Sequence, residues 1–161
     1  MTERLWAPWR LEYVETGADA GGCVLCDAVA GDDPLGLIVH RGAHAYVLMN
    51  LYPYSNGHVM VAPYRHLAKP GDLDAAERAE IWLLFDQAVR ALTEATSPQG
   101  FNAGINLGRV AGAGVEDHIH MHVVPRWSGD TNFMPVLADV KVMPEHVTRT
   151  AEKLRAAWPS G

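Results

Sequence analysis

Three histidines stand at every second position of one short segment: His118, His120 and His122. Alternate side chains of an extended strand point the same way, so we expect the three imidazoles to share one face, with the apolar residues between them on the other. Imidazole suits proton transfer, metal ligation and nucleophilic attack near neutral pH. Solvent-facing strand positions ordinarily carry Lys, Glu or Thr. The spacing therefore favours a reactive face over a solvated one.

A glycine-rich loop, Gly108–Gly114, leads into this segment. Glycine reaches positive φ angles, which let successive backbone N–H groups converge on an anion. The loop lacks the Gly-Lys-Ser/Thr of a Walker phosphate loop, and by itself it is more typical of a hairpin turn. Its place directly before the histidines favours phosphate binding.

The two cysteines, Cys23 and Cys26, form a C-x-x-C pair. Inside a cell such a pair is more often a metal site or a redox pair than a structural disulfide. The sequence before it lacks a long apolar leader region, and no apolar stretch approaches the roughly 20 residues of a membrane span. We therefore expect a cytoplasmic protein without a membrane partner. Two ligands do not complete a tetrahedral metal site, so a pair of reduced, half-buried thiols is the alternative.

The composition of the 161-residue chain, 48% hydrophobic and 20% charged, excludes disorder and leaves room for little more than one domain. Its 13 Lys and Arg against 19 Asp and Glu give a net charge of −6. This balance argues against nucleic acid as a partner, so any bound phosphate must be met by local groups.

Hydrophobic periodicity and turn signals predict the elements that must position these residues. A helix is expected from Ala75, because Asp74 and Glu77 have the spacing of a capping box. Short connections between strands favour antiparallel pairing. The expected class is α+β, an antiparallel sheet of about five strands with helices against one side. Strands are expected at 37–40, 45–49, 58–62, 101–107 and 117–124, and helices at 75–95 and from Pro144 to before Pro159.

The segment His118–Val124 resembles the histidine-triad (HIT) superfamily pattern, in which three histidines alternate with apolar residues, and Pro125-Arg126 continues it as in the dinucleotide-cleaving branch. The resemblance covers roughly residues 22–128. It implies one HIT-like domain over 1–161, with an N-terminal arm at 1–36, a core at 37–128 and a tail with a helix at 129–161. Further similarity is carried by Asn50, Gly57-His58-Val59, Pro63 and the Asn106–Gly114 loop. Asn50–Tyr54, Pro125–Trp127 and Gly129–Phe133 are similar to the bacterial diadenosine tetraphosphate phosphorylase subgroup.

The resemblance implies a mechanism for the histidines. His120 is the expected nucleophile, which attacks an α-phosphate as neutral imidazole and forms a nucleotidyl-histidine, its other ring nitrogen donating to a backbone carbonyl. His122 is expected to hydrogen-bond a phosphate oxygen or the leaving group. The expected substrate contacts are Asn106, Gly112 and Gly114 to phosphate and Asn50 to a ribose hydroxyl. Dinucleotide hydrolases of the family often carry Gln where Gly114 stands, which puts simple hydrolysis in doubt.

The resemblance also implies a structural zinc site completed by two histidines, with Cys23, Cys26, His66 and His118 as ligands, and no organic cofactor. Trp127 either stacks on a base or only packs against its neighbours. A homodimer formed through the long helix and an edge strand is expected. The remaining histidines are interpreted as structural or surface residues, with His58 the main exception.

The activity expected from the resemblance is nucleotidyl transfer on a dinucleoside polyphosphate. With inorganic phosphate as acceptor, diadenosine tetraphosphate gives ATP and ADP, whereas with water it gives AMP and ATP. Gly114 and Trp127 favour phosphate. Two alternatives are hydrolysis of nucleoside phosphoramidates, which the Pro125–Trp127 ending argues against, and a non-catalytic nucleotide-binding adaptor.

Overall fold

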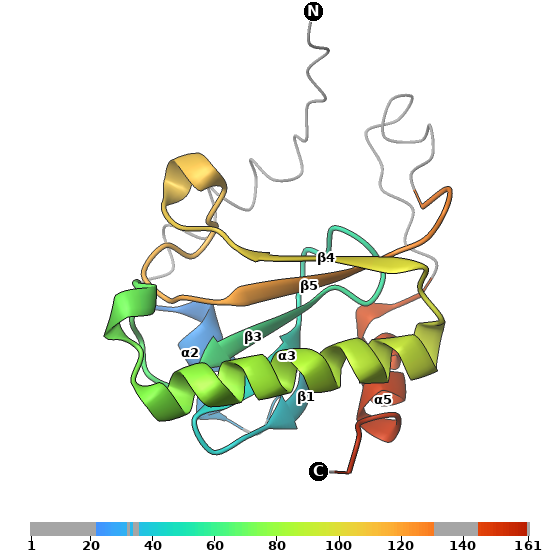
Figure 1. Cartoon of the computed structure of the whole chain (residues 1–161), viewed down its shortest axis with the longest axis horizontal. Helices are drawn as coiled ribbons and strands as arrows, with labels where there is room; N and C mark the ends of the chain where they lie inside the picture. Colours follow the sequence, from blue (N-terminus) through green and yellow to red (C-terminus); the bar gives the residue numbers. More distant parts are fainter. Residues whose placement is uncertain (1–21, 32, 34–35, 131–144, 161) are drawn as a thin grey trace, which may run out of the picture.

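The computed structural model describes residues 22–31, 33, 36–130 and 145–160 (Figure 1). Within them five strands form one antiparallel sheet in the order β1-β2-β3-β5-β4. The predicted α+β class is confirmed. The strands are β1 (Ile38–Arg41), β2 (Ala45–Met49), β3 (Val59–Pro63), β4 (Gly100–Ile105) and β5 (Met121–Arg126).

Two helices cover one face of the sheet, α3 (Ala75–Thr96) and α5 (Val147–Ala156). Leu84 and Leu92 of α3 and Leu154 of α5 are fully buried against the apolar residues of the central strands. Burying a leucine side chain contributes about 1.5–3 kcal/mol, so this apolar stripe fixes the helices to the sheet. None of the helices in the described parts of the chain combines the length and apolarity needed to cross a membrane.

A third helix, α2 (Val24–Ala30), packs on the opposite face of the sheet, where we expected no helix. Its one buried residue, Leu25, contacts the cluster around Tyr46 and Met60, and the Tyr46 hydroxyl donates to the Leu25 carbonyl at 2.8 Å. A helix of seven residues with one buried side chain has too few turns to show an apolar period. Residues 1–21 of the predicted arm lie outside the described residues.

The start of α3 has the predicted capping box. Asp74 Oδ1 accepts from the Glu77 backbone N–H, and Glu77 Oε2 accepts from the Asp74 N–H, both at 2.9 Å. One turn later, the Glu80 carboxylate accepts the backbone N–H groups of the three residues Ala43, His44 and Ala45, and so fixes the β1–β2 turn against the helix.

Only β2 has the predicted bounds; the other strand ends differ by one to four residues, most of all at the start of β5. β5 begins at Met121, not near 117, because its ladder with β3 extends only to the Val61–Met121 pair. Upstream of that pair, the Ile119 N–H donates instead to the Leu67 carbonyl at 2.7 Å. β4 ends at Ile105 instead of 107. At the C-terminal helix Pro144 lies outside the described residues, and His146 is the N-cap of α5.

Candidate active site and metal cluster

The alternation expected for the histidine segment is present. The three apolar residues between and after the histidines belong to the core under α3, whereas the His118 ring contacts the two cysteines at α2, on the other face of the sheet. His118, His120 and His122 are 0%, 6% and 9% exposed. Only His122 lies within β5, where it is paired with Met60 on one side and Gly104 on the other.

His120 is held by a main-chain carbonyl of its own segment. Its Nδ1 lies 2.8 Å from the His118 carbonyl oxygen, and because a carbonyl only accepts, Nδ1 carries the proton. The lone pair of the neutral ring is therefore on Nε2. Burial lowers the pKa of His120, which keeps the ring uncharged near neutral pH. His120 thus has the tautomer and charge of a nucleophile.

A cavity of about 210 Å³ reaches His120 on the α3 side of the sheet. Its walls are mainly apolar and include Ile81, Trp82, Ile105 and Met121. His120 borders this cavity, whose other walls belong to the α3 side of the sheet, whereas the imidazole itself packs against His122 on the opposite face.

His122 joins a chain of polar groups through His58, which is fully buried. The Tyr54 N–H donates to His58 Nδ1 at 3.0 Å, and Asn50 Nδ2 lies 3.3 Å from the same atom. The proton of a neutral His58 is therefore on Nε2, which lies 3.0 Å from His122 Nδ1 and donates to it. It follows that a neutral His122 carries its own proton on Nε2.

The sequence indicates His58 as the main exception among the histidines interpreted as structural or surface residues. In the structure it lies beside His122. Its type and its position after Gly57 were the available signals. Gly57 has a φ of +76°, and a Cβ there would lie 3.0 Å from the Leu92 side chain and 3.2 Å from Pro125. A glycine at this turn therefore lets the chain approach Leu92 and Pro125 closely just before His58 and the start of β3, the central strand.

The predicted phosphate contacts divide into two groups. Asn106 Nδ2 lies 3.5 Å from His122 Nε2 and donates to the Gly112 carbonyl at 3.4 Å, so Asn106 and Gly112 are next to the histidines. The loop amides are directed inward, because the N–H groups of Ala111 and Ala113 donate to the Gly108 carbonyl. Gly114 is exposed. In this conformation the group that faces the site is the side chain of Asn106. The backbone N–H groups of Ala111 and Ala113 are used within the loop.

Trp127 lies at the far end of β5. Its indole Nε1 donates to the Thr96 and Ser97 carbonyls at 3.3 and 3.2 Å, at the end of α3. Trp127 is five residue steps beyond His122, roughly 16 Å at about 3.3 Å per step. This placement favours the packing interpretation over base stacking.

The four predicted metal ligands converge, although they come from α2, the turn after β3 and the histidine segment. The ligand atoms of Cys23, Cys26, His66 and His118 all lie within 4.8 Å of one another. His118 Nδ1 is 3.4 Å from both sulfur atoms, and His66 Nδ1 is 3.4 Å from the Cys26 sulfur.

These separations fit a tetrahedral ion, for which metal–sulfur and metal–nitrogen bonds of about 2.3 and 2.0 Å place S and N roughly 3.5 Å apart. His118 Nε2 lies 2.9 Å from the Pro63 carbonyl and donates to it, which leaves the Nδ1 lone pair for a metal. Without an ion, burial and then the neighbouring Cys23 raise the pKa of Cys26 to about 11. The donor set can therefore hold a metal ion.

The described fold and histidine arrangement agree with the comparisons. The HIT domain family model matches residues 36–129, and the chain belongs to this family. An AP-4-A phosphorylase of Mycobacterium tuberculosis (strain ATCC 25618 / H37Rv) is 37% identical over 97% of this chain and 84% of its own length. Adenosine 5'-monophosphoramidase hnt1 of Schizosaccharomyces pombe is 29% identical over 82% of this chain and 95% of its own. The crystal structure of a Zn-bound histidine triad family protein from Mycobacterium smegmatis superposes with a TM-score of 0.68 and 28% identity, over 84% of this chain and 92% of that one.

Proposed function

We propose that this protein transfers a nucleotidyl group from a dinucleoside polyphosphate, through a covalent intermediate on His120, to inorganic phosphate. With diadenosine tetraphosphate, Nε2 of His120 attacks an α-phosphorus. A P–N bond forms, the bond from that phosphorus to the bridging oxygen breaks, and ATP leaves. An oxygen of inorganic phosphate then attacks the same phosphorus, the P–N bond breaks, and ADP is released.

The observation that carries this proposal is the 2.8 Å contact of His120 Nδ1 with the His118 carbonyl, which leaves Nε2 as a buried, neutral nucleophile. A nucleophile whose orientation is already fixed loses little entropy on attack. The same carbonyl stabilises the ring as it becomes positively charged in the adduct.

His122 and Asn106 are the groups that can meet the developing charge. The Nε2–H of His122 is the hydrogen-bond donor next to Asn106, so it can donate to a phosphate oxygen or to the leaving oxygen. His58 holds this tautomer through its 3.0 Å contact with His122 Nδ1. Asn50 contacts the same His58 ring at 3.3 Å, so a ribose hydroxyl bound by Asn50 would lie beside this chain of histidines.

Phosphate as acceptor is supported by the similarity to the mycobacterial phosphorylase and by Gly114, which has no side chain to contact the α-phosphate. The test is product analysis with diadenosine tetraphosphate, with and without inorganic phosphate. ATP and ADP formed only with phosphate support the proposal. AMP formed at the same rate in both reactions contradicts it and favours hydrolysis.

Hydrolysis of adenosine 5'-phosphoramidate is the second candidate, favoured by the similarity to the fission-yeast phosphoramidase. The same attack by His120 would break a P–N bond and release ammonia, with water as the acceptor. Comparing kcat/KM for the two substrates decides between the activities.

The metal cluster is proposed to hold structural zinc through Cys23, Cys26, His66 and His118. A zinc ion would join α2, the turn after β3 and the histidine segment while keeping the thiolates deprotonated. Metal analysis of protein purified without chelator should give one zinc per chain, and a metal-free protein of unchanged stability contradicts the assignment.

Free thiols persist in a reducing compartment, so we propose that the protein is cytoplasmic.

A homodimer is proposed through α3 and the β4 edge. Trp82 and Leu83 of α3 are 62% and 55% exposed, and Ile105 of β4 is 37% exposed. Large apolar side chains grouped on one surface are typical of an interface. Light scattering should give twice the mass of one chain, and Trp82→Glu should give monomers.

A further inference from the structure

The turn after β3 does two tasks at the site. The Pro63 carbonyl accepts from His118 Nε2 at 2.9 Å, and the Leu67 carbonyl accepts from the Ile119 N–H at 2.7 Å. The same turn carries His66, one of the four possible metal ligands. This stretch, Pro63–Leu67, is called the ligand turn below. It replaces the sheet ladder that the histidine segment lacks before Met121.

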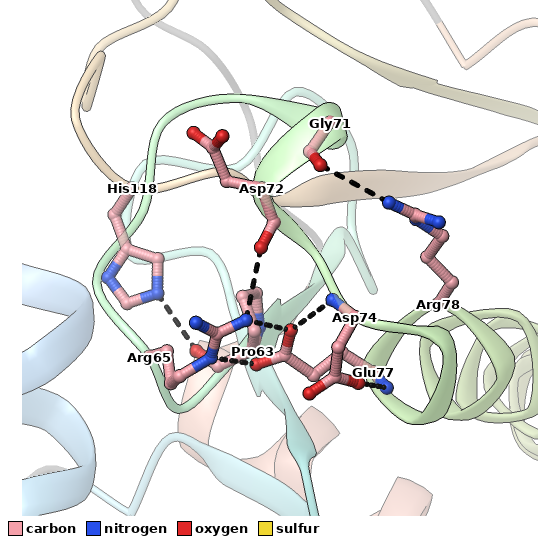
Figure 2. Close-up of polar contacts among 8 residues, drawn as sticks. All are labelled: Pro63, Arg65, Gly71, Asp72, Asp74, Glu77, Arg78 and His118. Carbon is pink, nitrogen blue, oxygen red and sulfur yellow. Dashed lines mark hydrogen bonds and ion pairs between the residues drawn. The ribbon is translucent and has the colours of Figure 1, made fainter.

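The ligand turn is itself attached to the start of α3 by one side chain. Arg65 Nε donates to Glu77 Oε1 and Arg65 Nη2 to Glu77 Oε2, both at 2.6 Å, and Nη2 also donates to the Asp72 carbonyl at 3.1 Å (Figure 2). Two parallel bonds between guanidinium and carboxylate fix orientation as well as distance. Arg65 lies between Pro63 and His66 in sequence, so fixing its position limits the movement of both.

Helix capping does not explain this arrangement. A capping box needs only one acceptor oxygen at the third helical position, and Gln supplies it as well as Glu. Glu77 is 2% exposed, and its second oxygen is used by Arg65 alone among the described contacts. The Arg65 hydrogen bonds lower the pKa of Glu77 to about 2, so the carboxylate stays charged although it is buried.

We infer that Arg65 and Glu77 are a positioning pair, which holds the ligand turn so that His66 and the Pro63 carbonyl are presented to the metal cluster and the His118 carbonyl to His120. This inference rests on the proposed metal site. It assigns neither residue a contact with the substrate. Loosening the pair lets His66 and the His118 ring move. The direct effect is weaker metal binding, and the indirect effect is a misplaced His120.

The test compares Glu77→Gln with Asp74→Ala in the full-length, zinc-loaded protein. Glu77→Gln keeps the capping bond to the Asp74 N–H but breaks the charged fork to Arg65. Asp74→Ala removes the other half of the capping box and leaves the fork in place. Each variant is assayed for zinc release to a chromogenic chelator, for the visible absorption of bound Co²⁺ and for melting temperature.

We expect Glu77→Gln to release zinc about 10- to 100-fold faster than wild type, as for other partners that orient metal ligands. Its Co²⁺ spectrum should shift, and kcat should fall more than KM rises. Asp74→Ala should melt at a lower temperature but release zinc at the wild-type rate. Arg65→Lys keeps the charge and the capping box but loses the fork, and it should also release zinc faster, so the test holds even if Glu77→Gln does not fold.

Equal zinc release by wild type, Glu77→Gln and Arg65→Lys would overturn the inference, as would equal acceleration in Asp74→Ala, which would show that only the helix start matters. Zinc release and Co²⁺ absorption do not depend on turnover. A wild-type protein that binds zinc but lacks phosphorolysis would therefore contradict the proposed function and leave this test intact.

Discussion

His120 and His122 are two residues apart but are held in different ways. His122 lies inside β5 and is paired on both sides, with Met60 and Gly104. His120 precedes the strand, and the stretch around it is held by single contacts to the Pro63 and Leu67 carbonyls and by the possible metal ligands around His118. In the proposed mechanism, this difference assigns the sheet to positioning the donor, and the ligand turn and the metal cluster to positioning the nucleophile.

Replacing each histidine separately should show the largest contrast. His120→Ala should lower turnover of diadenosine tetraphosphate by about 10⁴-fold or more, because the covalent route is lost. His122→Ala should cost about 10²–10³-fold, as for removal of one transition-state donor. Steady-state assays of both variants, with circular dichroism as the folding control, check this. Full activity of His120→Ala would contradict the assignment.

Breaking the metal cluster should affect the nucleophile's side of this comparison. Cys26→Ser should lose zinc and melt at a lower temperature, because the free energy of metal binding contributes to folding. We expect kcat to fall about tenfold, since the His118 carbonyl is less well fixed. Asp27→Asn, next to the cluster but not one of its four ligands, is the control. Unchanged stability and zinc content in Cys26→Ser would show that the cluster holds no metal.

Replacing His58 should affect the donor's side alone. His58→Phe keeps an aromatic ring but leaves His122 Nδ1 without its donor, so we expect kcat to fall roughly 10²-fold. Zinc content should match that of wild type. Loss of zinc in this variant would show that the two sides are not separate.

The Arg65–Glu77 pair also predicts a pH dependence of stability. The pKa of Glu77 is about 2 in the folded protein against 4.5 ordinarily, so the folded state binds fewer protons between these values. The contribution of Glu77 is therefore complete above about pH 4.5 and is lost as pH falls through 2. Urea unfolding of wild type and Glu77→Gln should give a stability difference that shrinks from pH 5 to pH 2. A constant difference would contradict the depressed pKa.

The smallest effect is expected at Trp127. Trp127→Phe removes the N–H that donates to the Thr96 and Ser97 carbonyls and should cost about 0.5–1.5 kcal/mol of stability. The KM for diadenosine tetraphosphate should not change. A severalfold rise in this KM would contradict the packing role and support base stacking by Trp127.

The sequence predicted the parts of the site that follow from local rules. The Asp74–Glu77 box begins α3, and strand alternation places the histidines away from the core, because each depends on spacing within a few residues. The meeting of the cysteines with His66 and His118 was inferred from family resemblance, since no local pattern relates residues 95 positions apart.

What the sequence missed depends on tertiary contacts. α2 is too short to show a period, and the role of His58 appears only when β3 and β5 pair. β5 pairs with β3 only from Met121 onward, and before that residue the ligand turn holds the histidine segment. Where the pairing stops depends on which strand residues find partners. The Arg65–Glu77 fork joins a turn to a helix across twelve residues, and its two members carry no motif in common.

In the proposed reaction, His120 carries the nucleotidyl group between donor and phosphate. The most direct measurement is the intact mass of the protein after brief reaction with diadenosine tetraphosphate without phosphate. We expect an added adenylyl group on His120 that disappears on addition of inorganic phosphate as ADP forms. An unmodified protein that nevertheless forms ATP and ADP would contradict it.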